Sequence, residues 1–120
     1  MNTIIRDAKI IDSESPFHNQ TVDILIVDGS IKKIGTSLPN TENTTEVKLD
    51  NLHVSQGWFD SSVSLGEPGF EERETIANGL DVAARSGFTA IALQPNTYPI
   101  MDNQSQINFV KSKANGYATQ

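Results

Sequence analysis

The sequence predicts a chain in two parts, an all-β segment followed by an α/β segment. Residues 3 to about 51 hold short β-rich runs separated by turn residues. From Gly57 onward, extended runs alternate with stretches whose apolar residues recur every three or four positions. A strand-helix-strand-helix order of this kind predicts right-handed crossovers and a parallel sheet.

The all-β segment is expected to contain five short strands. They fall at about residues 4–11, 21–27, 30–34, 45–50 and 52–55. Asp28 and Gly29 form a dipeptide that tolerates positive φ, so they predict a tight hairpin between the second and third strands. A polar stretch over 37–45 predicts a surface loop.

The α/β segment is expected to contain two strands and two helices. They fall at about residues 57–65, 75–86, 88–93 and 104–114. Gly87 can end the first helix in a left-handed conformation, and Asp102 or Asn103 can cap the second. Ile107 and Val110 are predicted to face inward from the second helix. The continuous apolar run at 88–93 predicts a parallel strand buried on both faces.

The stretch that organises the chain is 57–69, Gly-Trp-Phe-Asp-Ser-Ser-Val-Ser-Leu-Gly-Glu-Pro-Gly. Strand alternation predicts that Asp60, Ser62 and Ser64 share one face. The stretch resembles the start of the barrel in dihydroorotases and related amidohydrolases, which reads Pro-Gly-aliphatic-aliphatic-Asp-x-His-x-His-x-Arg-Glu-Pro-Gly. The resemblance implies a β-sandwich segment over 1–55 and the first two β/α units of a (β/α)8 barrel over 56–120.

The chain matches this motif at the positions that shape the strand and the turn, but it differs at the positions that bind metal and substrate. Its shared positions are Gly57, Asp60, Glu67, Pro68 and Gly69. In the family the two histidines bind the catalytic zinc and the arginine holds the substrate carboxylate. In this chain those positions are Ser62, Ser64 and Gly66, and the leading proline is Gln56. A serine hydroxyl is too weakly basic to replace imidazole, so no metal ligand, no catalytic residue and no cofactor are expected in this chain.

A second match is Pro95-Asn96-Thr97-Tyr98-Pro99, which is similar to the Pro-Asn-Thr-x-Pro loop after the second barrel strand. The resemblance makes Asn96 a substrate-binding residue. Its contact with a substrate carboxylate is expected to be weak, because Gly66 stands where the family has the charged, bidentate arginine.

Other chemistries at these residues are disfavoured. Ser62 and Ser64 lack the Gly-x-Ser-x-Gly elbow of serine hydrolases, and neither His18 nor His53 stands in a recognisable relation to them. The four acids near the first helix show no calcium-loop spacing. They are expected to offset the positive end of that helix instead, and they are Glu67, Glu71, Glu72 and Glu74.

Composition narrows the partners and the location. A net charge of −6 and a pI near 4.7 argue against nucleic acid, which is bound through clustered Lys and Arg. No cysteine is present, so disulfides and thiolate metal sites are excluded. The N-terminus lacks the apolar core of a signal peptide, and no apolar run approaches the ~18 residues that span a bilayer. A cytoplasmic location is therefore expected.

The interpretation is a dihydroorotase-like amidohydrolase relative, truncated, because a complete (β/α)8 barrel needs about 200 to 250 residues. The family reaction is reversible hydrolysis of the cyclic amide dihydroorotate to carbamoyl aspartate in pyrimidine biosynthesis. Three hypotheses stay open: a hydrolase with unusual ligands, a non-catalytic scaffold (a pseudo-enzyme) for a partner such as a transcarbamoylase, or a fragment from processing or cloning. The unpaired strand edges predict a homo-oligomer or the remainder of a longer chain as partner.

Overall fold

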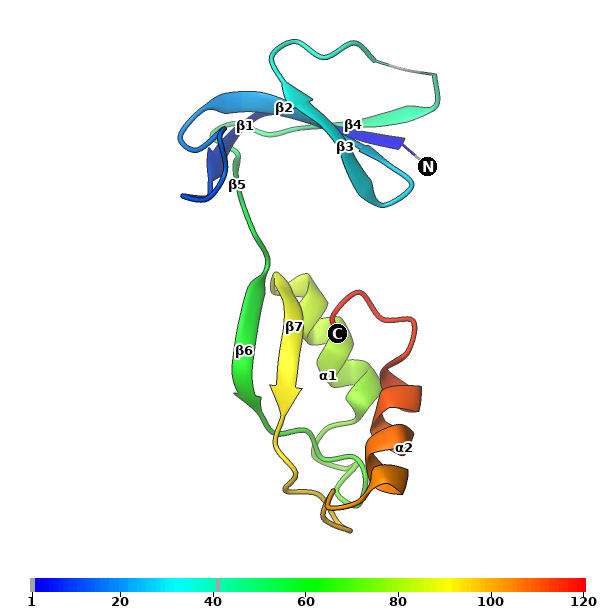
Figure 1. Cartoon of the computed structure of the whole chain (residues 1–120). Helices are drawn as coiled ribbons and strands as arrows, with labels where there is room; N and C mark the ends of the chain where they lie inside the picture. The colour runs from blue at the N-terminus through cyan, green and yellow to red at the C-terminus, as the bar shows by residue number, and fades with distance from the viewer. Residues whose placement is uncertain (1, 41) are drawn as a thin grey trace. The chain divides into compact units, whose positions relative to one another are not determined.

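The computed structural model describes residues 2–40 and 42–120 (Figure 1). The expected loop over 37–45 includes Thr41, which lies outside the described residues. The chain divides into two compact units, Met1–Gln56 and Gly57–Gln120. Within the described part of the chain, no helix is both long and apolar enough to cross a membrane.

The first unit is a single five-stranded sheet. Its strands are β1 (Asn2–Ile11), β2 (Thr21–Val27), β3 (Ser30–Gly35), β4 (Thr44–Lys48) and β5 (His53–Ser55). The order is β3-β2-β1-β4, and β5 pairs with β1 beyond the end of β4 (Figure 1). All five predicted strands are present, but the sequence did not predict that β4 and β5 pair with β1 in parallel.

The sequence explains the β2-β3 hairpin and the apolar face of the first sheet. Asp28 has φ of 48° and Gly29 has φ of 77°, so the dipeptide forms the predicted tight turn between β2 and β3. The sheet buries an apolar core on one face. This core is built from Ala8, Ile10, Val22 and Ile24.

The second unit alternates strands and helices as predicted. Its elements are β6 (Trp58–Val63), α1 (Ile76–Arg85), β7 (Phe88–Leu93) and α2 (Gln104–Ala114). Thr75 caps α1 by accepting the Asn78 N–H, and Gly87 follows the helix with φ of 89°. Asn103 is the residue that caps α2, by accepting the Gln106 N–H.

Both helices pack on one face of the β6-β7 pair. The shared core consists of Leu65, Ile76, Leu80 and Val110. Two burial predictions are wrong. Ile107 is 44% exposed, because α2 turns only its Val110 side fully into the core. Strand β7 is not buried on both faces: none of its residues is fully buried, and Thr89 is exposed.

A buried carboxylate ties the strands of the first unit together. Strand β1 has a bulge between Ile5 and Ala8, where Asp7 takes φ of 51°. Asp23 of β2 is only 4% exposed and accepts the Asp7 N–H at 3.1 Å and the Leu38 N–H at 3.0 Å. The Arg6 guanidinium donates to Asp23 at 2.8 Å and to Glu46 of β4 at 2.9 Å. One ion cluster therefore spans β1, β2 and β4.

The surroundings of Asp23 set its protonation. Burial acts to raise the pKa of Asp23, but hydrogen bonds from the Asp7 N–H, Arg6 and the Leu38 N–H outweigh it, so this pKa is lowered. The hydrogen bond from Arg6 likewise lowers the pKa of Glu46. A lowered carboxyl pKa contributes stability above the unfolded-state pKa, and this contribution is lost as pH falls through the folded-state pKa.

We predict that Asp23→Asn destabilises the first unit by about 1.5–3 kcal/mol at neutral pH, because it removes a charge-assisted hydrogen bond from a buried group. The difference from the wild type should shrink as pH falls below about 4, where the carboxylate of the unfolded chain is protonated, and it should vanish only below the lowered folded-state pKa of Asp23. Urea unfolding followed by the amide NMR signals of β1 and β2 measures both effects. Asp50→Asn is the control, since Asp50 is exposed and has no hydrogen-bond partner among the described residues. A difference that stays constant with pH would contradict the role of the charge.

Candidate functional site

The candidate site lies where β6 and β7 end. The two strands pair in parallel, with Trp58 opposite Phe88, Asp60 opposite Ile91 and Val63 opposite Leu93. Parallel pairing brings the carboxyl ends of both strands to the same edge of the sheet. Ligands bind at this edge in α/β folds and (β/α) barrels.

Two hydroxyl–amide pairs join the ends of the strands. The Gln94 side-chain amide donates to the Ser62 hydroxyl oxygen at 3.1 Å. The Asn96 amide donates to the Ser64 hydroxyl oxygen at 2.8 Å, and the Ser64 hydroxyl lies 3.1 Å from the Asn96 carbonyl oxygen. All four residues are exposed. Ser62 and Ser64 are thus held by neutral partners in the loop that follows β7.

The predicted shared face of Asp60, Ser62 and Ser64 is wrong at Asp60. The pairing is irregular between Asp60 and Val63, which indicates a β-bulge, and the Asp60 carboxylate accepts the Ser62 N–H at 2.9 Å. Because of this irregularity, Asp60 lines the same pocket as Val63 and Leu65. Its carboxylate is therefore bonded to the Ser62 backbone, and no hydrogen bond joins it to the hydroxyl of Ser62 or Ser64 among the described residues.

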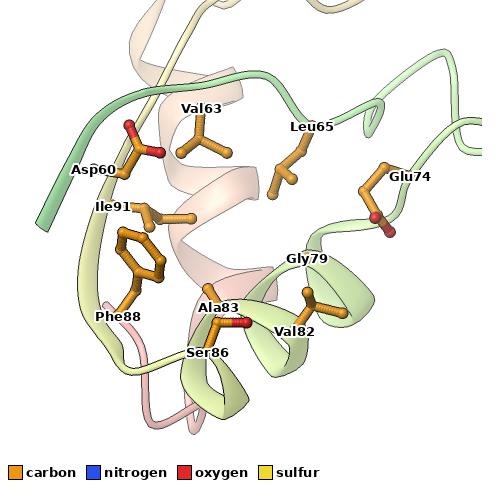
Figure 2. A pocket seen from close by; sticks show the side chains of 10 residues that line it. All are labelled: Asp60, Val63, Leu65, Glu74, Gly79, Val82, Ala83, Ser86, Phe88 and Ile91. Carbon is orange, nitrogen blue, oxygen red and sulfur yellow. The ribbon is translucent and has the colours of Figure 1, made fainter. Parts of the chain in front are cut away.

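Figure 2 shows this pocket, which lies between the two strands and α1 and has a volume of about 240 Å³. It is mainly apolar, and its two acids lie at opposite ends of the view (Figure 2). Its lining residues are Asp60, Val63, Leu65, Glu74, Gly79, Val82, Ala83, Ser86, Phe88 and Ile91. The pocket belongs to the helix side of the sheet. Ser62 and Ser64 do not line it, so it is separate from the edge that carries the hydroxyl–amide pairs.

Gly66 sits in a turn too tight for a side chain. Its N–H donates to the Glu74 carbonyl at 3.0 Å, and its carbonyl accepts the Phe70 N–H at 2.7 Å. A Cβ atom at Gly66 would lie 2.0 Å from the Phe70 carbonyl oxygen and 2.8 Å from the Glu74 carbonyl oxygen. The clash is with backbone on both sides, so an arginine cannot occupy this position without movement of the loop.

Glu67 is the acid that meets the first helix. It is 9% exposed, and its carboxylate accepts the Ile76 N–H at 3.0 Å and pairs with Lys113 of α2 at 3.2 Å. This geometry offsets the positive end of α1, as the sequence suggested for the acidic group. The Glu71 carboxylate instead accepts the Gly69 N–H at 3.0 Å, a hydrogen bond that lowers the pKa of Glu71.

The two loops that resemble family motifs contact each other. The Tyr98 N–H donates to the Pro68 carbonyl at 3.0 Å, and the buried Thr97 hydroxyl donates to the Pro99 carbonyl at 2.9 Å. Gly69 has φ of 100°, and a Cβ there would lie 2.1 Å from the Tyr98 carbonyl oxygen. The second loop therefore holds Asn96 against Ser64 through a close backbone contact.

The donor set at this edge does not fit zinc. Zinc in proteins takes imidazole, thiolate or carboxylate, whereas the side chains at the strand ends are hydroxyls and amides. Among residues 2–40 and 42–120, no three His, Cys, Asp or Glu side chains gather as a metal site would require. Both histidines belong to the first unit: His18 accepts the Asp12 N–H at 3.1 Å, and His53 lies 2.8 Å from the Asn51 carbonyl.

Comparison with solved structures defines the class of fold. The chain superposes on an L-hydantoinase (dihydropyrimidinase) from Arthrobacter aurescens with a TM-score of 0.79 and 21% identity, over 93% of this chain and 24% of that protein. A D-hydantoinase (dihydropyrimidinase) from Thermus sp. gives a TM-score of 0.70 and 24% identity over the same shares. The fold is thus that of part of a hydantoinase-type amidohydrolase.

Sequence comparison defines the family. A family model described as dihydro-orotase-like matches residues 53–119, and the chain belongs to this family. It is 35% identical over 118 residues to a dihydroorotase of Citrifermentans bemidjiense, which covers 98% of this chain and 28% of that protein. It is 38% identical over 112 residues to a dihydroorotase of Pelotomaculum thermopropionicum, over 93% of this chain and 26% of that protein. The chain thus spans little more than a quarter of the length of these relatives.

Sequence reasoning missed two residues that shape this region. The Gln94 side chain donates a hydrogen bond to the Ser62 hydroxyl, and Lys113 forms an ion pair with Glu67. Gln94 precedes Asn96 by two positions directly after a strand, so continued alternation could have placed both on one face. Nothing in the sequence indicates the pairing of Lys113 with Glu67, because it depends on how α2 packs.

We predict that Gly66→Ala destabilises the second unit by about 1–3 kcal/mol, the usual cost of forcing an extra group into a packed site. Gly35→Ala is the matched control, since a Cβ there would meet only the Leu38 side chain at an ordinary 3.5 Å. Urea unfolding of the second unit, followed by Trp58 fluorescence, measures the first change, and the amide signals of β3 measure the second. Equal effects of the two substitutions would contradict the tight turn at Gly66.

Proposed function

We propose that this chain is a non-catalytic member of the dihydroorotase-like family, in which the strand-end site is a neutral hydrogen-bonding surface. The observation that carries this proposal is that Ser62 and Ser64 stand at the metal-ligand positions, and each hydroxyl accepts a hydrogen bond from an amide side chain of the loop after β7. An enzyme that hydrolyses a cyclic amide through a metal needs a Lewis acid and a generated hydroxide. Neither can be assembled on these hydroxyls.

The packing around Gly66 supports the same proposal, because it leaves no room for a substrate-binding side chain. In the family an arginine binds the substrate carboxylate at this position, and the backbone of Phe70 and Glu74 blocks any side chain there. Losing a bidentate charged contact removes the strongest single interaction available to a carboxylate substrate. Asn96 is left as the proposed substrate-facing residue, and its amide is already paired with Ser64.

The architecture that we propose is the one the family resemblance implies. The first unit corresponds to a β-sandwich segment, and the second corresponds to the first two β/α units of a (β/α)8 barrel. The parallel β6-β7 pair with α1 between its strands in sequence supports the second assignment. The family's reaction belongs to pyrimidine biosynthesis, and this chain is proposed to keep the frame of that enzyme without its chemistry.

We predict no turnover of dihydroorotate above the buffer rate, with or without added zinc. The double variant Ser62→His, Ser64→His should remain inactive, because two imidazoles leave a catalytic zinc short of protein ligands and Gly66 still leaves the substrate carboxylate unbound. The absorbance of dihydroorotate and the appearance of carbamoyl aspartate measure this. Ser55→His, Ser61→His is the matched control for nonspecific zinc capture, since Ser55 and Ser61 lie outside the metal-ligand positions. Zinc-dependent hydrolysis by the unaltered chain would refute the proposal.

An interaction role is the second candidate function, and exposed aromatic side chains favour it. Trp58 and Phe59 are each 62% exposed on β6. Strand β6 pairs only with β7 among the described residues, so its other edge presents free backbone groups. Exposed apolar groups beside an open strand edge are typical of an interface. We propose a second copy of this chain as the partner, with a transcarbamoylase as the alternative.

We predict that the chain self-associates at micromolar concentration and that Phe59→Ser weakens this association by about tenfold or more, the effect of removing an aromatic anchor from an interface. Sedimentation equilibrium, with the intact mass measured on the same sample, gives the stoichiometry. Ile31→Ser is the control, because Ile31 is 64% exposed on β3 in the other unit. A monomer that unfolds cooperatively would contradict self-association. Association only after a transcarbamoylase is added would favour the alternative partner, and no association in either case would contradict the interaction role.

A further inference from the structure

The chain contains two asparagines that are each followed by glycine, at 78–79 and 115–116. In such a pair the backbone nitrogen of the glycine can attack the side-chain amide carbon of the asparagine. Glycine permits this approach because it has no Cβ and rotates freely. The reaction needs a free glycine N–H and a mobile asparagine side chain, so the local structure decides which pair reacts.

The first pair is held inside helix α1. The Gly79 N–H donates to the Thr75 carbonyl at 3.0 Å, and the Asn78 side-chain amide donates to the Glu74 carboxylate at 2.9 Å. A Cβ at Gly79 would lie 2.5 Å from the Leu65 side chain, which shows how closely the helix packs there. The nucleophile and the electrophile are therefore both restrained in the folded chain.

The second pair lies just beyond α2 and lacks these restraints. Asn115 and Gly116 are both exposed. Among the described residues, neither the Asn115 side chain nor the Gly116 N–H has a hydrogen-bond partner; the Asn115 N–H alone is bonded, to the Ser112 carbonyl at 3.4 Å. Gly116 has φ of 90°, and no atom lies within 4 Å of the point where its Cβ would be. The space around the Gly116 α-carbon is therefore open.

We propose that Asn115 is a site of spontaneous deamidation in the native protein, with water as the only co-reactant. The Gly116 nitrogen loses its proton to solvent base and bonds to the Asn115 side-chain carbon, and the bond from that carbon to the amide nitrogen breaks as ammonia leaves with a proton. A five-membered succinimide results. Water then opens either carbonyl of the ring, which gives aspartate or isoaspartate.

The position of this pair gives the modification a structural effect. Residues 115–116 connect α2 to a tail that is attached to β7. The buried Thr119 hydroxyl donates to the Phe88 carbonyl at 2.6 Å. The Gln120 N–H donates to the Thr89 carbonyl at 3.0 Å and its carbonyl accepts the Ile91 N–H at 2.7 Å, the pattern of a parallel strand pair.

In isoaspartate the main chain runs through the side-chain carbons of residue 115. This adds one carbon atom to the backbone between α2 and the tail. The modified chain is therefore expected to release the tail from β7 and expose the edge of that strand.

The rate at each asparagine tests the proposal. The chain is held in mildly alkaline buffer, digested under acidic conditions and analysed by mass spectrometry for conversion of amide to acid. We expect Asn115 to react at least about tenfold faster than Asn78 in the folded chain, since a group held in a helix reacts only in its locally opened state. In concentrated urea both sites should react at comparable rates. Unreacted Asn115, or equal rates in the folded chain, would overturn the proposal.

Two variants separate the chemistry from its effect. Gly116→Ala should slow conversion of Asn115 severalfold while leaving Asn78 unchanged, and an unchanged Asn115 rate would contradict attack by the residue-116 nitrogen. Hydrogen exchange at the Ile91 amide reports tail attachment. It should accelerate in the isoaspartyl chain and stay near the wild-type rate in Asn115→Asp, which carries the charge on a normal backbone. Loss of protection in both would assign the release to charge and contradict the backbone explanation.

Discussion

The parallel pairing of β6 with β7 determines what can meet at the candidate site. Because both strands point the same way, Ser62 and Ser64 lie beside Gln94 and Asn96. The irregular pairing after Asp60 places this acid in the lining of the apolar pocket. The helices then cover the opposite side with an apolar core. The register of β6 against β7 determines both the polar edge at the strand ends and the apolar face under the helices. A change in this register would alter both together.

The turn after β6 fixes the second half of the site. Gly66 is pressed between the carbonyl groups of Phe70 and Glu74, and Glu67 bonds to the first N–H of α1 while it pairs with Lys113. The Glu-Pro-Gly sequence that resembles the family motif therefore has a structural role in this chain. It follows the strand, bonds to the start of α1 and packs against the Tyr98 loop. A family relationship carried by these residues indicates a shared fold, and the chemistry depends on positions 62, 64 and 66.

Local signals in the sequence predicted the elements well. Gly87 follows α1 with a positive φ, Asn103 caps α2 through a hydrogen bond three residues away, and Asp28-Gly29 forms a turn by its own backbone preference. Features made by distant residues were not predictable in this way. The parallel pairing of β4 with β1, the Arg6–Asp23 ion pair and the hydroxyl–amide pairs each join residues at least 17 positions apart. The face predicted for Asp60 from strand alternation was wrong because the bulge in β6 inserts one residue, which no periodic pattern reveals.

We propose that Ser62 and Ser64 belong to neutral hydrogen-bonded pairs and do not form a metal centre. Titration with zinc, followed by the side-chain amide NMR signals of Gln94 and Asn96, tests it at the residues concerned. We predict that both signals keep their positions when zinc is equimolar with the chain. A saturable shift of both signals, with one zinc bound per chain, would contradict it.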